Sequence, residues 1–518
     1  MCHPGDERKP SELYNVIRGQ QIFDALCSHC KGGSAYVDPY YLYTLCRLDR
    51  PDLDYDAYTA DLADLFAQKL LVAEDRRIFL ADNYRYENSA AKLLADTLRL
   101  PPLASAEVPL PIWVGDKVLC GEQRDAVRLA LSHRISMILG GAGTGKSLLI
   151  RAIYDCTDVG PLETLVCAPT GKAARNLCDV TRLPARTVHS ALGTLPDEDW
   201  LSPVVWEHIR LVIVDEASML TLGMLAGILG RMSRHCRLVL VGDDKQLQSV
   251  GAGNVIPDLL ALHVPHILLA RNHRQGRIDC ALAHNVFFFG KLRYGEDLVF
   301  DDTFSLFELE DGAAEKALVK EAVGAYRRKE NVLVLSPYRN KGPLSAASLN
   351  QRIRNGVNPA RKGKKYLRQN GYLLRDGDRV LITRNDRTHD VSNGDVGILH
   401  IIRDRKSEWK YEIALPDGRI PRWEGDSAVE NFAHLELAYA LTVHKSQGSQ
   451  YDTVLMALTD SMGKMLTRNL FYTAISRAQR CVRLYGGMQA VDTAMQRSPA
   501  PRRSMLVPKT RRRMAEIS

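Results

Sequence analysis

A glycine-rich segment that starts at residue 140 could bind the phosphates of a nucleotide. It fits the pattern G-x-x-x-x-G-K-S and consists of Gly140, Gly141, Ala142, Gly143, Thr144, Gly145, Lys146 and Ser147. Glycines let backbone N–H groups converge on phosphate oxygens, and the N-terminus of a following helix adds a favourable dipole. The segment predicts an NTP site in which Lys146 contacts the β- and γ-phosphates and the Ser147 hydroxyl binds Mg²⁺.

Two adjacent carboxylates, Asp215 and Glu216, follow the apolar run at 211–214. A carboxylate at the end of a strand beside the phosphate loop can reach Mg²⁺, and a second can polarise the attacking water. Together with the glycine-rich segment, this pair predicts an NTPase that uses ATP and Mg²⁺, with Asp215 at the metal. Gln123 lies upstream, and its amide offers one donor and one acceptor that match the edge of adenine.

The elements that must position these residues have the pattern of an α/β domain. Short apolar runs at 135–139, 164–168, 211–214 and 237–241 alternate with helical stretches. Continuous apolar strands between helices indicate a parallel sheet covered on both faces. The glycine-rich segment directly follows the first run and precedes a helix-compatible stretch, which is the context that its pattern requires. A second α/β pattern begins near residue 331 and resumes at 453–457 and 481–485.

Three further segments differ from these α/β patterns. Residues 1–108 have apolar positions at three- and four-residue steps, which indicates a helical domain that ends at Pro101 and Pro102. Short alternating runs between 372 and 432 suggest a small β insertion. The last 18 residues hold six basic side chains and one acidic side chain, and we expect residues 491–518 to form a disordered basic tail.

The overall composition excludes several classes of protein. The chain has 518 residues, of which 45% are hydrophobic and 25% charged, so it is neither collagen-like nor wholly disordered. No apolar run approaches the ~18 residues of a membrane helix, so we expect no membrane partner. The net charge of +8 permits a polyanionic partner without showing one. Eleven scattered cysteines indicate a reducing, cytoplasmic compartment.

Cys27 and Cys30 form one C-x-x-C pair. A zinc or iron–sulfur site needs four ligands, and no second such pair follows. The pair is either two cysteines on a partly buried helix or part of a metal site.

An ordered series of motifs resembles a known family. The segments are APTGKAA at 168–174, TVH at 187–189, DEASM at 215–219, GDxxQL at 242–247, RQ at 274–275, LTVHKSQG at 441–448 and YTAISRA at 472–478. The series resembles that of superfamily 1 helicases, in the branch that contains RecD, the α subunit of exodeoxyribonuclease V. The resemblance spans about residues 115–490.

The resemblance implies two RecA-like domains, at 109–275 and 276–490, that enclose ATP between them. The second would contain an SH3-like β insertion at about 385–432. The first would contribute Gln246 and the second Arg477, with Arg274 at the junction, and guanidinium groups suit the charge of the γ-phosphate. Gly448 and Gln450 would contact the nucleotide, although relatives usually have Glu at the position of Gln450. An amide can still accept a hydrogen bond from a sugar hydroxyl.

The resemblance also implies a DNA substrate. Thr170, His189, Thr442 and His444 match positions along the single-strand track, although isolated residues of these types are more often structural. The branch moves 5′ to 3′ on single-stranded DNA towards duplex junctions, and segment 193–206 would correspond to a hairpin at the point of strand separation. We expect a standalone helicase, or a motor subunit whose residues 1–108 dock RecB- or RecC-like partners. An NTP-dependent DNA-binding switch that does not unwind is the hypothesis from another class.

A basic stretch lies between Arg352 and Arg379. Such a run is either a solvated surface or a contact for a phosphate backbone, and the sequence favours neither.

Overall fold

The protein is described here from a computed structural model. It describes residues 19–101, 103, 113–114, 117–194, 199–201, 204–271, 304–369, 371–386, 388–405 and 408–516. Arg274 lies outside these ranges, and so does part of the predicted hairpin at 193–206. No helix in the described part of the chain is long and apolar enough to cross a bilayer.

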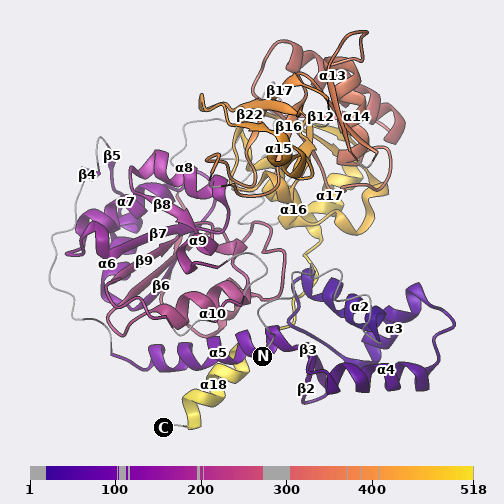
Figure 1. Ribbon diagram of the computed structural model, residues 1–518. Coiled ribbons are helices and arrows are strands. Elements are labelled where there is room, and N and C mark those ends of the chain that lie inside the picture. Colours follow the sequence, from indigo (N-terminus) through magenta and orange to yellow (C-terminus); the bar gives the residue numbers. More distant parts are fainter. Residues whose placement is uncertain are drawn as a thin grey trace.

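The first RecA-like domain has a six-stranded parallel sheet in the order β11-β6-β10-β9-β7-β8 (Figure 1). The strands are β6 (Ile135–Gly140), β7 (Thr164–Ala168), β8 (Ala185–Thr187), β9 (Leu211–Val214), β10 (Arg237–Gly242) and β11 (His266–Leu269). The helices are α6 (Gly121–Ser132), α7 (Lys146–Cys156), α8 (Gly171–Thr181), α9 (Val188–Leu192), α10 (Leu222–Arg231) and α11 (Val255–Ala261), with short 3₁₀ turns η2 (Pro161–Glu163) and η3 (Ala217–Met219). A two-stranded ribbon, β4 (Trp113–Val114) and β5 (Lys117–Val118), precedes them. The central strands β6, β9 and β10 are almost fully buried, which explains their unbroken apolar runs.

The second RecA-like domain repeats this arrangement with a five-stranded parallel sheet, β12-β23-β22-β13-β21. The strands are β12 (Phe304–Glu308), β13 (Val332–Ser336), β21 (Ala440–Thr442), β22 (Tyr451–Leu458) and β23 (Ala478–Gly486). The helices are α13 (Asp311–Arg327), α14 (Ala346–Val357), α16 (Arg468–Ile475) and α17 (Met488–Gln496), with 3₁₀ turns η5 (His444–Ser446) and η6 (Asp460–Met465). The predicted fold class of two RecA-like domains is confirmed.

The predicted SH3-like insertion is present as an antiparallel sheet in the order β19-β18-β17-β16-β20. Its elements are β16 (Arg379–Ile382), β17 (Val396–Arg403), β18 (Lys410–Ala414), β19 (Arg422–Glu424), α15 (Gly425–Phe432) and β20 (Leu435–Leu437). The sheet extends beyond the 385–432 range on both sides. A separate two-stranded ribbon, β14 (Tyr366–Gln369) and β15 (Tyr372–Arg375), joins it to α14.

The N-terminal domain has four described helices: α2 (Gln20–Lys31), α3 (Pro39–Asp49), α4 (Tyr55–Ala67) and α5 (Ala81–Leu98). It also contains a small antiparallel sheet that the helical interpretation did not include, formed by β1 (Tyr36–Val37), β3 (Arg77–Leu80) and β2 (Leu71–Glu74). These strands are too short to show a clear alternation in the sequence. Cys30 and Cys46 are buried in the core of this domain, and the described residues contain no cluster of His, Cys, Asp or Glu that could hold a metal.

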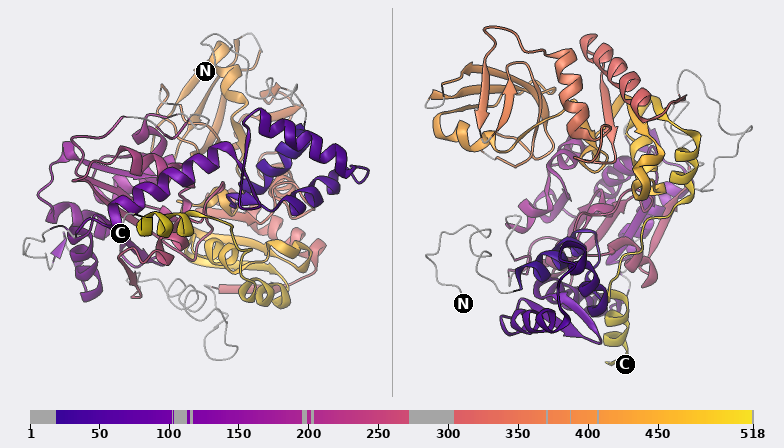
Figure 2. Two further views of the ribbon diagram at one scale, coloured as in Figure 1. Left: turned by 90° about the horizontal axis from the view of Figure 1, so that it is seen from below. Right: turned by 90° about the vertical axis from the view of Figure 1, so that its right-hand side faces the viewer.

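The prediction of a disordered C-terminal tail is wrong. Residues Leu506–Glu516 form helix α18, which lies beside α5 in both figures (yellow against indigo in Figure 2). The buried carboxylate of Glu87 on α5 accepts hydrogen bonds from the Met505 backbone N–H at 2.7 Å and the Ser504 hydroxyl at 3.1 Å. Lys509 pairs with Glu74 at 2.9 Å and with Glu87 at 3.5 Å. The tail is ordered because acidic groups far away in the sequence bind it.

Candidate nucleotide-binding site

The glycine-rich loop connects the end of β6 to the start of α7, as its pattern predicts. Gly143 and Gly145 have φ angles of 81° and 87°, a left-handed conformation that side-chain-bearing residues rarely adopt. The Lys146 ammonium donates hydrogen bonds to the carbonyls of Gly140 and Gly141 at 2.7 and 2.8 Å. The Lys146 side chain therefore folds back over the loop, where phosphate oxygens would compete for the same protons.

Gln123 is buried on α6 directly beside this loop. Its amide donates to the Thr144 carbonyl at 3.2 Å, and its oxygen accepts from the Cys120 backbone N–H at 3.1 Å. A Cβ on Gly145 would lie 2.5 Å from the Gln123 amide nitrogen, so the loop needs glycine at this position. Both edges of the Gln123 amide are used by the chain itself, which supports the loop, and contact with a base stays a prediction.

The acidic pair lies at the C-terminal end of β9. Burial raises the pKa of Asp215 to about 7, and the neighbouring Glu216 carboxylate adds to the shift. Glu216 has a left-handed φ of 50°, and its backbone N–H donates to Asp215 at 2.8 Å. Since the two carboxylates are held close together, a cation beside them would relieve their repulsion.

A third buried carboxylate, Asp243, follows β10 at the same edge of the sheet. It accepts hydrogen bonds from Gln246 at 3.0 Å and from the Tyr472 hydroxyl at 2.8 Å. The Tyr472 hydroxyl in turn accepts from the Ala142 backbone N–H in the phosphate loop at 3.3 Å. Tyr472 belongs to α16 of the second RecA-like domain, so one side chain joins that domain to the phosphate loop and to Asp243.

The loop after Asp243 is also held from the second domain. The Leu247 backbone N–H donates to the Thr473 hydroxyl at 2.8 Å, and its carbonyl accepts from the Gln447 amide at 2.8 Å. The Asn469 amide donates to the Gln246 carbonyl at 3.1 Å. The two domains therefore meet at the γ-phosphate side of the predicted site. Asp243, Gln447, Tyr472 and Thr473 lie within the sequence motifs, but no role was predicted for them.

Arg477 is 4% exposed and lies at the end of α16. It donates to the Thr473 carbonyl at 3.1 Å and to the Ser476 hydroxyl at 3.0 Å, both in the second domain. Gly448 has a left-handed φ of 72° and lies against Ala173 of α8, where a Cβ would approach within 3.3 Å. Gln450 is exposed and accepts a hydrogen bond from Gln479 at 3.0 Å.

The four residues predicted along the DNA track occupy different settings. Thr170 caps α8 by accepting from the Ala173 N–H at 3.2 Å, and the Thr442 hydroxyl accepts from the Lys445 N–H at 3.4 Å. The His189 ring packs against Trp200 with ring centres 4.7 Å apart. Burial lowers the pKa of both His189 and His444, so each is a neutral hydrogen-bonding group at physiological pH.

The SH3-like sheet contacts the first domain beside Thr170. Arg175 of α8 binds both carboxylate oxygens of Asp395 at 2.7 and 2.8 Å, and also the Ser392 hydroxyl at 3.2 Å. A Cβ on Gly171 would collide with Ser392. The insertion therefore lies over the N-terminus of α8.

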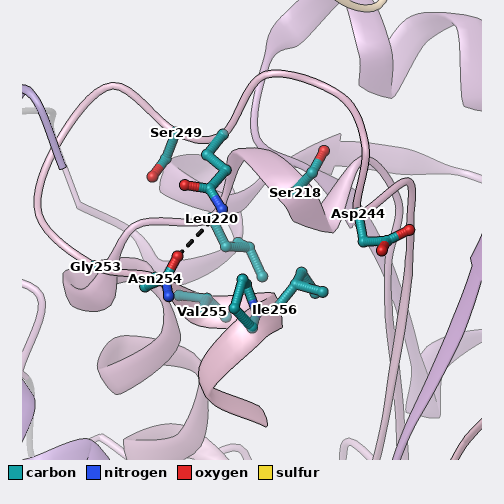
Figure 3. A pocket seen from close by; sticks show the side chains of 10 residues that line it. Ser218, Leu220, Asp244, Ser249, Gly253, Asn254, Val255 and Ile256 are labelled. Carbon is teal, nitrogen blue, oxygen red and sulfur yellow. Dashed lines mark hydrogen bonds between the residues drawn. The ribbon is translucent and has the colours of Figure 1, made fainter. Parts of the chain in front are cut away.

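A small pocket is lined by residues of the segment that follows Asp243 and by the start of α11 (Figure 3). Ser218 and Leu220 line one part of it, Asp244 another, and Asn254 at the start of α11 accepts a hydrogen bond from Gln248 at 3.1 Å. The loop around this pocket also contacts the N-terminal domain, because the N–H groups of Gly251 and Gly253 donate to Lys31 and Gly33 carbonyls at 3.1 and 2.9 Å. The same loop thus joins the predicted ATP site to the N-terminal domain.

The residues present fit a magnesium nucleotide. The phosphate loop offers backbone donors and one ammonium group, and hydroxyl and carboxylate oxygens such as those of Ser147 and Asp215 are the ligands that Mg²⁺ prefers. The adjacent Asp215 and Glu216 carboxylates supply negative charge that a divalent cation would balance.

Three protein families match parts of the chain. Residues 118–287 match an AAA domain, residues 349–413 the SH3 domain of ATP-dependent RecD-like DNA helicases, and residues 437–485 a UvrD-like helicase C-terminal domain. The chain is similar to the ATP-dependent RecD2 DNA helicase of Deinococcus radiodurans, at 34% identity over 87% of this chain. It spans 61% of the length of that relative.

The chain is also similar to the RecBCD enzyme subunit RecD of Mycolicibacterium smegmatis, at 29% identity over 90% of this chain and 89% of that protein. Among solved structures, the Pif1 helicase of Candida albicans matches 78% of this chain and all of that chain, at 19% identity with a TM-score of 0.45.

Proposed function

The chain belongs to the RecD-like branch of the superfamily 1 helicases, and on that premise we propose that it is an ATP-driven DNA helicase that translocates 5′ to 3′ on single-stranded DNA. Its substrate is a single strand that leads into duplex, and its cofactors are ATP and Mg²⁺. The protein acts in the cytoplasm, in DNA recombination, double-strand-break repair or the processing of foreign DNA.

The observation that carries this proposal is the contact of Tyr472 with both Asp243 and the phosphate loop. A nucleotide in the loop lies beside a residue of the opposite domain, so binding and hydrolysis change the fit between the two domains. Coupling of nucleotide state to interdomain motion is what a translocating motor requires.

Each residue of the site has a specific task in this proposal. Lys146 and the loop N–H groups bind the β- and γ-phosphates, while Ser147 and Asp215 hold Mg²⁺, which neutralises phosphate charge. Glu216 accepts a proton from the attacking water, and Gln246 positions that water. Arg477, brought forward when the domains close, stabilises the negative charge that develops on the γ-phosphate, and Arg274 does the same from the junction. Gln123, Gly448 and Gln450 contact the base and sugar.

DNA binding is assigned to Thr170, His189, Thr442 and His444. Two of these side chains are neutral imidazoles and two are hydroxyls, which hydrogen-bond phosphates without a strong charge attraction. Weak individual contacts suit a motor that releases its track in every cycle, because affinity grows steeply with each neutralised phosphate.

A second candidate is a motor subunit that works only within a RecBCD-type complex, with the N-terminal domain docking its partners. The similarity to RecD of Mycolicibacterium smegmatis, the RecBCD subunit, favours it. Size-exclusion mass with and without candidate subunits, together with unwinding by the purified chain alone, separates the two candidates. Robust unwinding by the isolated chain would contradict an obligate subunit.

The test of the proposed function measures ATP turnover with and without single-stranded DNA, and then unwinding of duplexes with a 5′ or a 3′ tail. We expect DNA to stimulate turnover and only the 5′-tailed duplex to be unwound. Turnover that DNA leaves unchanged would contradict a motor, and stimulation without unwinding would identify an NTP-dependent DNA-binding switch. Unwinding from a 3′ tail alone would contradict the polarity.

A further inference from the structure

One segment of the chain has a large excess of positive charge. Residues 331–375 contain ten Lys and Arg side chains and no Asp or Glu. The whole chain has 69 basic and 61 acidic residues, so without this segment it has 59 basic and 61 acidic residues and a net charge of −2. The elements from β13 to β15 therefore contain ten positive charges that no acidic residue within the segment offsets.

Part of this charge is used inside the fold. Arg352 pairs with Glu315, Arg354 lies near the buried Asp378, and Arg339 binds Glu436 at 3.1 Å. Lys364 donates to the Asn358 side chain and Lys365 to the Ile402 carbonyl. Arg352 therefore joins α14 to α13, whereas Lys364 and Lys365 tie the segment before β14 to residues after α14 and to β17.

Three further cations are exposed and lie close in sequence to an exposed tyrosine on the ribbon. Arg361, Lys362 and Arg368 are exposed, and the structure shows no ion pair for them with any described residue. Tyr366 is 53% exposed, and Arg368 points to the same face because side chains alternate along β14, with Leu367 buried between them. Along the chain, exposed Lys362 precedes β14 and exposed Arg368 follows Tyr366 within it. We call this face of β14, with residues 361–368, the ribbon face.

The turn of the ribbon, next to Tyr372, lies near the predicted DNA track. The Tyr372 hydroxyl on β15 accepts a hydrogen bond from the Leu437 backbone N–H at 2.9 Å, which fixes the ribbon to β20. Tyr372 also lines an open pocket together with Asn340, Thr442 and Lys445. Thr442 is one of the residues assigned to the track, so a DNA strand at Thr442 would lie adjacent to the turn between β14 and β15.

From this arrangement we propose that the ribbon face binds single-stranded DNA beyond the motor track, as a continuation of the strand that passes Thr442. The proposal rests on the proposed helicase function. Single-strand sites combine cations that follow the backbone with aromatic rings on which bases stack, and the ribbon face offers both. A solvated surface would not require an acid-free segment or leave a large aromatic ring exposed among cations.

The test compares binding to a short oligonucleotide of about eight nucleotides, which fills the track alone, with binding to one of about thirty nucleotides. The ribbon variant is Lys362→Glu with Arg368→Glu, and a second variant is Tyr366→Ala. The matched control is Lys316→Glu with Lys320→Glu, two exposed lysines on α13 whose reversal changes the net charge equally. Fluorescence anisotropy gives the affinities, and ATP turnover stimulated by the short oligonucleotide reports the motor track.

We expect the ribbon double variant to bind the long oligonucleotide about tenfold more weakly and to lower its salt slope by about 1.4, since each lost phosphate contact removes about 0.7. Tyr366→Ala should weaken long-strand binding with the salt slope unchanged. Short-strand affinity and turnover should match the wild type in every variant.

Four results would overturn the proposal. If the ribbon variants bind the long oligonucleotide as tightly as the control does, the ribbon face is not a DNA site, and the proposed helicase function is unaffected. Equal losses on both oligonucleotides would make the ribbon part of the motor track. A loss confined to a blunt duplex would identify duplex DNA as the ligand. A wild-type protein that binds neither oligonucleotide would contradict both the ribbon site and the proposed function.

Discussion

The hydroxyl of Tyr472 donates a hydrogen bond at 2.8 Å to the carboxylate of Asp243, across the boundary between the two RecA-like domains. Both groups are buried, and burial raises the pKa of each. The same hydroxyl accepts the Ala142 N–H of the phosphate loop. Tyr472 therefore contacts both the predicted phosphate loop and the segment that contains Gln246.

Replacing Tyr472 with phenylalanine should uncouple the two domains. The variant leaves Asp243 with one fewer donor, and a lost hydrogen bond to a charged group costs about 1.5–3 kcal/mol. We expect DNA-stimulated ATP turnover to fall about tenfold or more, since 1.4 kcal/mol corresponds to a factor of ten. Tyr326→Phe is the matched control, because its hydroxyl donates to the Tyr439 carbonyl at 2.7 Å within one domain. Equal turnover in the two variants would show that the contact across the boundary has no coupling role.

Lys146→Ala should abolish turnover while the protein stays folded. In the described part of the chain the ammonium donates hydrogen bonds to the Gly140 and Gly141 carbonyls of the loop alone, so the fold loses little. Removal of one charged donor from a transition state typically costs at least about a hundredfold in rate. Steady-state turnover and thermal unfolding are measured on the same preparation, with Lys320→Ala as control. Activity that survives Lys146→Ala would place the catalytic site elsewhere.

Arg477→Ala should lower turnover by about a thousandfold if Arg477 reaches the γ-phosphate on closure, as arginines at this step commonly contribute that much. The exposed Arg480 provides the control, as Arg480→Ala removes the same charge from β23, three residues further along the chain. ATP affinity should change little, because the arginine acts after the domains close. Loss of ATP affinity with unchanged turnover at saturation would assign Arg477 to nucleotide binding instead.

The sequence predicts the phosphate loop, the acidic pair and the strands of both sheets because their determinants are local. Residues 135–139 need only be apolar to form a buried strand, and the glycines of 140–145 need only their own backbone freedom. The contacts that complete the site are not local: Tyr472 lies 330 residues from Ala142, and Arg502 donates to the Ser249 carbonyl over 253 residues. No pattern within one segment specifies such pairs.

The order of the C-terminal tail also depends on contacts with residues far away in the sequence. Residues 506–516 have few apolar side chains, so the sequence alone indicates a solvated basic segment. Their helix forms because Glu74 and Glu87, more than 400 residues earlier, bind the Lys509 ammonium and because Arg99 binds the carbonyls of Arg513 and Met514.

Asp258 should make stability depend on pH in the acidic range. Burial on α11 raises the pKa of Asp258 to about 6, although the Ser504 hydroxyl opposes the shift. Because the folded state holds this proton more tightly than the unfolded state, its contribution to stability is present below about pH 4 and is lost as the pH rises towards 6. Asp258→Asn removes the titration, so the Tm of the variant relative to the wild type should increase between pH 4.5 and pH 7. The exposed Asp179→Asn provides the control, and an equal pH response in both variants would contradict the assignment.

Lys509→Met should release the C-terminal helix from the N-terminal domain. The change keeps the length of the side chain but leaves the fully buried Glu87 without its cation, and breaking a buried pair costs about 3–5 kcal/mol. Some of that cost is recovered when Glu87 takes up a proton, since burial already raises its pKa. We therefore expect a loss of about 2 kcal/mol in urea unfolding and faster trypsin cleavage after Arg502 and Arg503. Arg512→Met is the control, because Arg512 is exposed and, among the described residues, pairs with Glu516 alone, on its own helix. If both variants are cleaved at the wild-type rate, the ion pairs of Lys509 do not hold the helix, and the Met505 and Ser504 hydrogen bonds to Glu87 must suffice.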